Sequence, residues 1–291
     1  MYSSRYLLSF FKLVLISGFL NSCTAAGYQE FQQYSKAYDA QYVQGDTVLQ
    51  EVGAAERHIW SKTAPLLNEN GTFKPDEAAY YLDNVEPPYT AAVRASLKVI
   101  KGYNDAIVAL ASGENAKALS NRVSTLTVNV AAAVGATRAM GSSTITPAAL
   151  AKTGAGDVAR KLTDQLVLLP VVNEVASIAS REAFRTQLIN SHSRIHIMLM
   201  ELRNNGTPVM YEMLREKSGK VGNSRRPLPD PDAQAMLAGW VLLLDKTDIA
   251  LMAAVAAAKT GSQFNLDTLS QASVELTLLA EQVRTAKQSK K

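Results

Sequence analysis

Apolar residues recur every three or four positions along most of this chain, and this spacing limits the fold more than any other feature. Between residues 114 and 140, for example, it is followed by Leu119, Val123, Leu126 and Val130. An α-helix brings residues at this spacing onto one face, whereas a half-buried strand requires strict alternation. The chain has no convincing run of alternating β-branched residues and no repeat of about 20 to 50 residues. The spacing therefore predicts an all-α fold.

About six long helices are predicted, which would pack as an antiparallel bundle or as two stacked sub-bundles. Turns rich in Gly, Pro and Asn separate the helices, among them a turn at residues 204–208. The first helix carries a stripe of aromatic residues that we expect in the core, namely Phe31, Tyr34, Tyr38 and Tyr42. A break near Gly45 is an alternative to one continuous helix. The long helices begin near Tyr28, Pro88, Glu114, Val171, Asp232 and Leu266, with shorter ones after Asp157 and Val209.

Residues 141–156 are the candidate boundary inside this helical body. The stretch is rich in Gly, Ala, Ser and Thr, and it contains Pro147. Small residues and proline favour loops over long helices. The composition predicts either a flexible link within one domain or a boundary between two halves of residues 23–291.

The charge of the chain does not indicate a nucleic-acid partner. The net charge is only +4, and 47% of the residues are hydrophobic against 19% charged, which is ordinary for a folded protein. Basic residues cluster only at Arg225-Arg226 and in the tail from Arg284 to Lys291. Clusters of this kind usually lie in solvated loops or chain ends. Contact of the tail with anionic lipid or cell-wall polymer is the alternative, and no nucleic-acid binding is expected.

The first 22 residues have the order of zones found in an export signal. Arg5 and Lys12 supply positive charge, and residues 13–20 form a short apolar run that leads through Asn21-Ser22 to Cys23. The run is too short to span a bilayer, which requires about 20 apolar residues. We therefore predict a signal peptide at residues 1–22 and a mature helical domain at residues 23–291.

The sequence Leu20-Asn21-Ser22-Cys23 resembles the lipobox of bacterial lipoproteins. The resemblance implies that the Cys23 thiol carries a diacylglycerol thioether, that cleavage follows, and that the new amino terminus is acylated. Two or three acyl chains would hold the protein firmly on a membrane. Thr24 stands where aspartate would favour the inner membrane, so the resemblance implies the periplasmic face of the outer membrane. An ordinary secretory signal cleaved near residues 24–26 is the alternative.

A candidate metal site lies on the longest predicted helix. His192, His196 and Met200 follow one another at intervals of four, so they share one helix face. Two histidines at this spacing can hold one metal ion, and a thioether favours copper over zinc. No glutamate lies between the histidines as in metalloprotease helices, and no fourth ligand is evident. Histidines packed and hydrogen-bonded inside the bundle are the competing interpretation.

No arrangement of residues has the pattern of a known catalytic site. The chain has no Gly-x-Ser-x-Gly turn, no Walker sequence and no Gly-x-Gly-x-x-Gly loop. A single cysteine excludes an internal disulfide and any cysteine-based zinc site. We therefore predict no enzymatic activity and no cofactor.

Two functions follow from these observations. The first is a membrane-anchored envelope lipoprotein that acts as a structural or protein-interaction module, with an unidentified envelope protein as its partner. The second is a periplasmic binding module whose bundle holds a small ligand or a copper ion. The residues expected around such a ligand are Tyr34, Tyr38, His192, His196 and Met200.

Mass spectrometry of the purified mature protein tests the lipid prediction. We expect an amino-terminal peptide that begins at Cys23 and carries the added mass of two or three acyl chains. A Cys23→Ser variant should lack this mass and remain uncleaved, because the thioether forms on the sulfur. An unmodified amino terminus downstream of residue 23 would contradict the prediction.

Overall fold

The structure is a computed structural model that describes residues 27–67, 82, 84–112, 116–142, 148–167, 181–218 and 231–260. Cys23, the predicted signal peptide, both basic clusters and the predicted helix after Leu266 lie outside these ranges. The described residues contain no strand, and the prediction of an all-α bundle is confirmed. The helices are α2 (Tyr28–Leu67), α3 (Pro88–Ser112), α4 (Ala116–Ser142), α5 (Ala148–Thr153), α6 (Ala155–Val167), α7 (Arg181–Glu201), α8 (Thr207–Ser218) and α9 (Pro231–Thr260).

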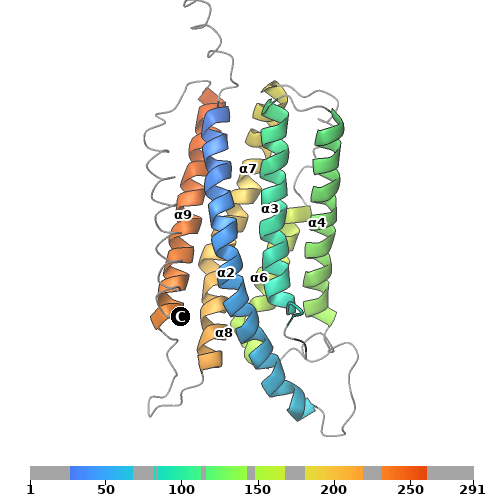
Figure 1. The fold of residues 1–291 in the computed structure, drawn as a ribbon, viewed down its shortest axis with the longest axis vertical. Coiled ribbons are helices and arrows are strands. Elements are labelled where there is room, and N and C mark those ends of the chain that lie inside the picture. The colour runs from blue at the N-terminus through green and yellow to red at the C-terminus, as the bar shows by residue number, and fades with distance from the viewer. Residues whose placement is uncertain are drawn as a thin grey trace, which may run out of the picture.

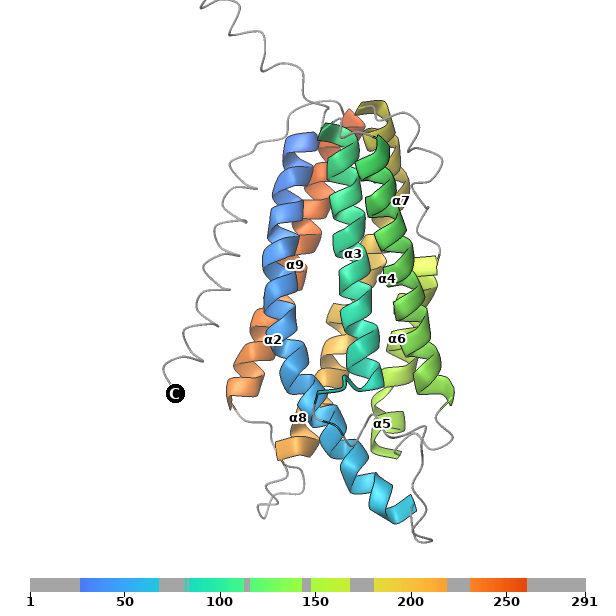
Figure 2. The same cartoon turned by 45° about the vertical axis from the view of Figure 1, so that its right-hand side comes forward.

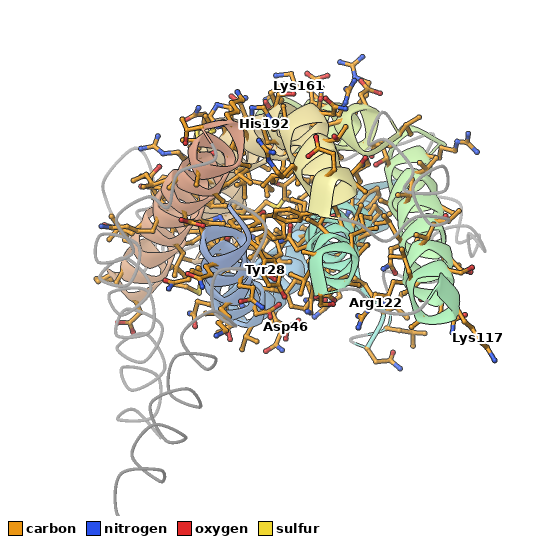
Figure 3. All side chains as sticks on the ribbon, turned by 90° about the horizontal axis from the view of Figure 1, so that it is seen from above. Tyr28, Asp46, Lys117, Arg122, Lys161 and His192 are labelled. Atoms are coloured by element: carbon orange, nitrogen blue, oxygen red, sulfur yellow. The ribbon has the colours of Figure 1, made fainter. Side chains whose placement is uncertain are left out.

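The long helices lie side by side along one axis and mostly run in alternating directions (Figures 1 and 2). Helices α2, α3, α7 and α9 pack together as one group, and α3, α4, α6 and α7 pack as a second. Viewed along the axis, the two groups lie next to each other, and Lys117 and Lys161 point outward at the rim (Figure 3). One cluster of buried apolar side chains runs through both groups. The groups therefore share two helices and one core, and they are not stacked end to end.

Helix α2 begins where the chain lies close against α9. Gly27 has a φ of +82°, a conformation that favours glycine, and its carbonyl accepts a hydrogen bond from the Phe31 amide at 2.9 Å. A Cβ at this position would lie 2.8 Å from the backbone nitrogen of Ala258. The start of α2 and the end of α9 therefore meet at the same end of the bundle.

A buried carboxylate joins α2 to the beginning of α3. Glu56 accepts hydrogen bonds from the Tyr89 amide at 2.9 Å, the Thr90 amide at 2.9 Å and the Thr90 hydroxyl at 2.7 Å. Burial raises the pKa of Glu56, and these three hydrogen bonds act in the opposite direction. Amides in the first turn of a helix have no partner within that helix. Glu56 supplies this partner from a neighbouring helix and so fixes where α3 starts.

The turn predicted at residues 204–208 is wrong, because the chain remains helical there. Residues Leu202–Gly206 form a π-helical turn that leads directly from α7 into α8. The Thr207 amide and hydroxyl both bond to the Leu202 carbonyl, the hydroxyl at 3.0 Å. In a π turn each amide donates to the carbonyl five residues earlier instead of four. This change of hydrogen-bond pattern lets the helix continue past Pro208, which has no amide hydrogen to donate. The Tyr89 hydroxyl donates to the Gly206 carbonyl at 3.2 Å and holds this turn against α3.

Most of the candidate boundary at residues 141–156 is helical where the structure describes it. Helix α4 continues to Ser142, α5 spans Ala148–Thr153, and α6 begins after Gly154, which has a φ of +77°. Helix α6 then packs on both α3 and α4. A link at the remaining residues, 143–147, stays a prediction.

Helix α2 is continuous through Gly45, so the alternative of a break there is not observed. The reason lies in the packing, since a Cβ at Gly45 would be 2.9 Å from the Cζ3 atom of Trp240. The absence of a side chain brings the buried Trp240 ring of α9 close to the α2 backbone. Gly45 is therefore a site of close helix approach.

We expect Gly45→Ala to destabilise the protein by up to about 2 kcal/mol. Overpacking costs roughly 1–3 kcal/mol, and the higher helix propensity of alanine offsets only about 1 kcal/mol of this. Gly135→Ala in α4 is the matched control, because no atom lies within 4 Å of its added Cβ, and it should stabilise the protein by about 0.5–1 kcal/mol. Urea unfolding followed by circular dichroism measures both. Equal effects of the two substitutions would contradict the packing argument.

Candidate functional site

Three polar contacts set the register between the antiparallel helices α7 and α9. The Arg185 guanidinium donates to the Ala258 carbonyl at 3.0 and 2.9 Å. About three turns further along α7, His196 bonds to a carboxylate of α9, and Arg203 in the following π turn bonds to another. Apolar packing alone has little directionality, whereas each of these contacts selects one relative position of the helices. We take this seam and the polar side chains beneath it as the candidate site.

The two acidic residues in the middle of α9 are paired across this seam. His196 Nδ1 lies 2.6 Å from Asp248 Oδ1, and Arg203 forms a two-pronged contact with Asp245 in which Nη2 lies 3.2 Å from Oδ2. The carboxylate of Asp248 is only 14% exposed, while His196 is 41% exposed. These pairs explain why an apolar helix carries charges at its centre. None of the helices that the structure describes is long and apolar enough to cross a membrane.

The structure places the predicted metal ligands in separate surroundings. His192 Nδ1 lies 2.6 Å from the Ile189 carbonyl of its own helix, while His196 bonds to Asp248. A carbonyl only accepts, so His192 carries its proton on Nδ1, and a metal ion would have to bind Nε2. Met200 is partly buried against the core. Within the described ranges no three His, Cys, Asp or Glu side chains come together to hold a metal, and the copper site stays a prediction.

A layer of polar side chains lies in the core beneath the His196–Asp248 pair. Tyr103 of α3 is hydrogen-bonded to Ser191 of α7, and Ser191 also bonds to the Gln187 carbonyl. Tyr38 of α2 donates to the Leu97 carbonyl at 2.8 Å. All of these groups are buried, and their hydrogen bonds offset the cost of removing them from water.

Four buried side chains in the same group of helices have polar atoms that make no hydrogen bond within the described structure. They are the Tyr34 hydroxyl, the amides of Gln41 and Asn104, and the indole N–H of Trp240, with exposures of 0%, 0%, 1% and 1%. Burial raises the pKa of Tyr34 far above its usual range, and the charge of Asp248 adds to this. The phenol therefore keeps its proton at neutral pH. Each unpaired group costs stability, so this layer is the least satisfied part of the core.

The constellation predicted from the sequence is thus only partly assembled. Tyr34 and His196 are both influenced by Asp248, whereas Tyr38 is bonded to Leu97 and His192 to its own helix. Sequence reasoning missed Asn104, although the signal was present. This residue continues the apolar series of α3 from Ile100 to Ile107, so a polar side chain occupies a core position.

Comparison of the chain with protein-family models, with curated proteins and with solved structures gives no match.

Paired substitutions of the buried tyrosines test the account of the polar layer. Tyr34→Phe should be neutral or stabilising by up to about 1 kcal/mol, because it removes an unpaired buried hydroxyl. Tyr38→Phe is the matched control on the same helix and should destabilise by about 1 kcal/mol, because it removes the hydrogen bond to Leu97. Urea unfolding compares the two. A larger loss for Tyr34→Phe would show that its hydroxyl has a partner in the folded protein.

Proposed function

We propose that the chain is a lipid-tethered helical bundle of the bacterial cell envelope that acts as a non-enzymatic structural or protein-interaction module. The tether is the acylated Cys23, at the periplasmic face of the outer membrane. The proposal rests on the lipobox resemblance of residues 20–23 and on one observation of the fold, which is where helix α2 begins.

That beginning is at one end of the bundle axis. Gly27 is pinned against Ala258, and Ala258 is in turn bonded to Arg185 near the start of α7. Cys23 lies four residues before Gly27, which limits their separation to about 14 Å. An acylated Cys23 would therefore hold this end of the bundle close to the bilayer.

The geometry of the bundle then projects its other end into the aqueous space. Helix α2 has 40 residues, which corresponds to a length of about 60 Å. Its far half packs with α8, so both helices would lie away from the lipid. A rigid body of this length, held at one end, is suited to present helix faces to another envelope protein.

The polar side chains that could have pointed to chemistry support helix packing instead. Asp248 bonds to His196, and Asp245 bonds to Arg203. Ser191 is hydrogen-bonded to Tyr103, and Glu56 accepts hydrogen bonds from the first turn of α3. Each contact joins two helices. This use of the titratable and hydroxyl groups favours a structural module over an enzyme.

Fluorescence quenching by brominated phospholipid tests the orientation. The chain has two tryptophans, Trp60 and Trp240, and both lie more than about 25 Å along their helices from the Gly27 end. The acylated protein is reconstituted into vesicles that contain brominated phospholipid. The fluorescence that a Lys259→Trp substitution adds to that of the two natural tryptophans should then be strongly quenched. The matched Lys62→Trp variant, at the exposed far part of α2, should not. Equal quenching of both variants would contradict the end-on orientation.

The interaction itself is tested by chemical cross-linking in intact envelopes, with the natural chain compared with Cys23→Ser. We expect discrete cross-linked species that depend on the tether, because anchoring raises the local concentration of the bundle near a membrane partner. The absence of any cross-linked species would oppose an interaction role. Cross-linked species that form equally with Cys23→Ser would show that the interaction does not require the lipid tether.

A further inference from the structure

Helix α9 is apolar on two opposite faces. One face packs in the core with Leu237, Trp240, Leu244 and Leu251. The opposite face carries apolar residues that the described part of the chain leaves largely uncovered, and we call it the outer α9 stripe. Its members are Ala235, Ala238, Leu242, Ile249, Met252 and Ala256.

The outer α9 stripe has the spacing of a helix-packing seam. Its steps of three and four residues continue over the full length, with Asp245 at the one polar position. Leu242, Ile249 and Met252 are 45%, 57% and 41% exposed. Single exposed apolar residues are common, but a series at this period is the pattern by which a further helix packs. A helix that is apolar all round is normally buried on every side.

The chain itself continues from the end of this helix. Thirty-one residues, 261–291, follow Thr260, and they include Leu269, Leu276, Leu279 and Val283 at the same three-and-four spacing. Residues 261–265 contain Gly261 and Asn265, which suit a short turn between antiparallel helices.

The lengths of the stripe and of this segment also agree. The outer α9 stripe spans residues 235–256, and a helix over residues 266–287 would have the same number of residues, so each measures about 32 Å. After a turn at 261–265, an antiparallel helix would bring Leu276 level with Ile249 and Val283 level with Leu242. Glu281 would come within one helical turn of Lys246, which is close enough for an attraction between opposite charges.

We propose that residues 266–287 form a helix that packs antiparallel on the outer α9 stripe and completes the bundle. The occupant of this face is thus the chain's own carboxyl-terminal segment. The proposal does not depend on acylation of Cys23, and it stands or falls separately from the proposed function.

Disulfide trapping tests it, and the chain is well suited because Cys23 is its one cysteine. In the full chain with Cys23→Ser, the pair Ile249→Cys and Leu276→Cys should form an intramolecular disulfide under mild oxidation. The matched pair Ile249→Cys and Leu278→Cys should not, because residue 278 lies two positions on and faces the opposite side of the helix. No bond in the first pair, equal bonds in both pairs, or a disulfide-linked dimer would overturn the proposal, the last in favour of a second copy on this face.

A labelling experiment gives a readout that does not depend on disulfide geometry. Ile249→Cys alone should react slowly with a maleimide in the full chain and several-fold faster when residues 266–291 are deleted. Val43→Cys on α2, where the side chain is 69% exposed, should react at the same fast rate in both forms. Equal rates for Ile249→Cys in the two forms would overturn the proposal, and an unchanged rate for Val43→Cys excludes general unfolding as the cause of a difference.

Discussion

The packing of α3 against α7 is the contact on which both groups of helices depend. Each group uses the same two helices, so the apolar core is continuous across the molecule. Two tyrosines of α3 mark the two ends of this contact, since Tyr103 bonds to Ser191 and Tyr89 to the Gly206 carbonyl. Tyrosine brings a large apolar surface together with a hydroxyl that needs a partner. The ring therefore contributes to burial, while the hydroxyl selects where α7 must lie.

Directional contacts of this kind recur wherever two helices meet at a defined height. Glu56 fixes the start of α3, Arg185 holds the end of α9, and Asp248 holds His196 at mid-height. Burial of apolar surface stabilises many relative positions of two helices almost equally, because it depends on area and not on direction. The buried polar contacts distinguish among those positions, because a displaced helix would leave charges and amides unpaired.

The same bundle is uneven in how completely its polar atoms are satisfied. Tyr34, Gln41 and Asn104 lie in the group formed by α2, α3, α7 and α9, and the hydrogen bonds of Tyr38 and Tyr103 lie in that group too. Apolar surface is also unevenly covered, since α9 is packed on one face and open on the other. Both features belong to the group formed by α2, α3, α7 and α9.

The sequence by itself determined the all-α class, the starts of α2, α3 and α9, and the burial of Phe31, Tyr34 and Tyr38. These follow from apolar spacing and from Pro and Gly signals, which act over a few neighbouring residues. The lipobox resemblance at Cys23 is likewise a property of the sequence and does not depend on the fold. Only the tertiary structure decided that two groups share α3 and α7, that the helix continues through residues 204–208, and that His196 pairs with Asp248 and not with His192. Those outcomes depend on which side chains meet across helices distant in the chain. Local spacing places residues on a face, but it does not specify the partner of that face.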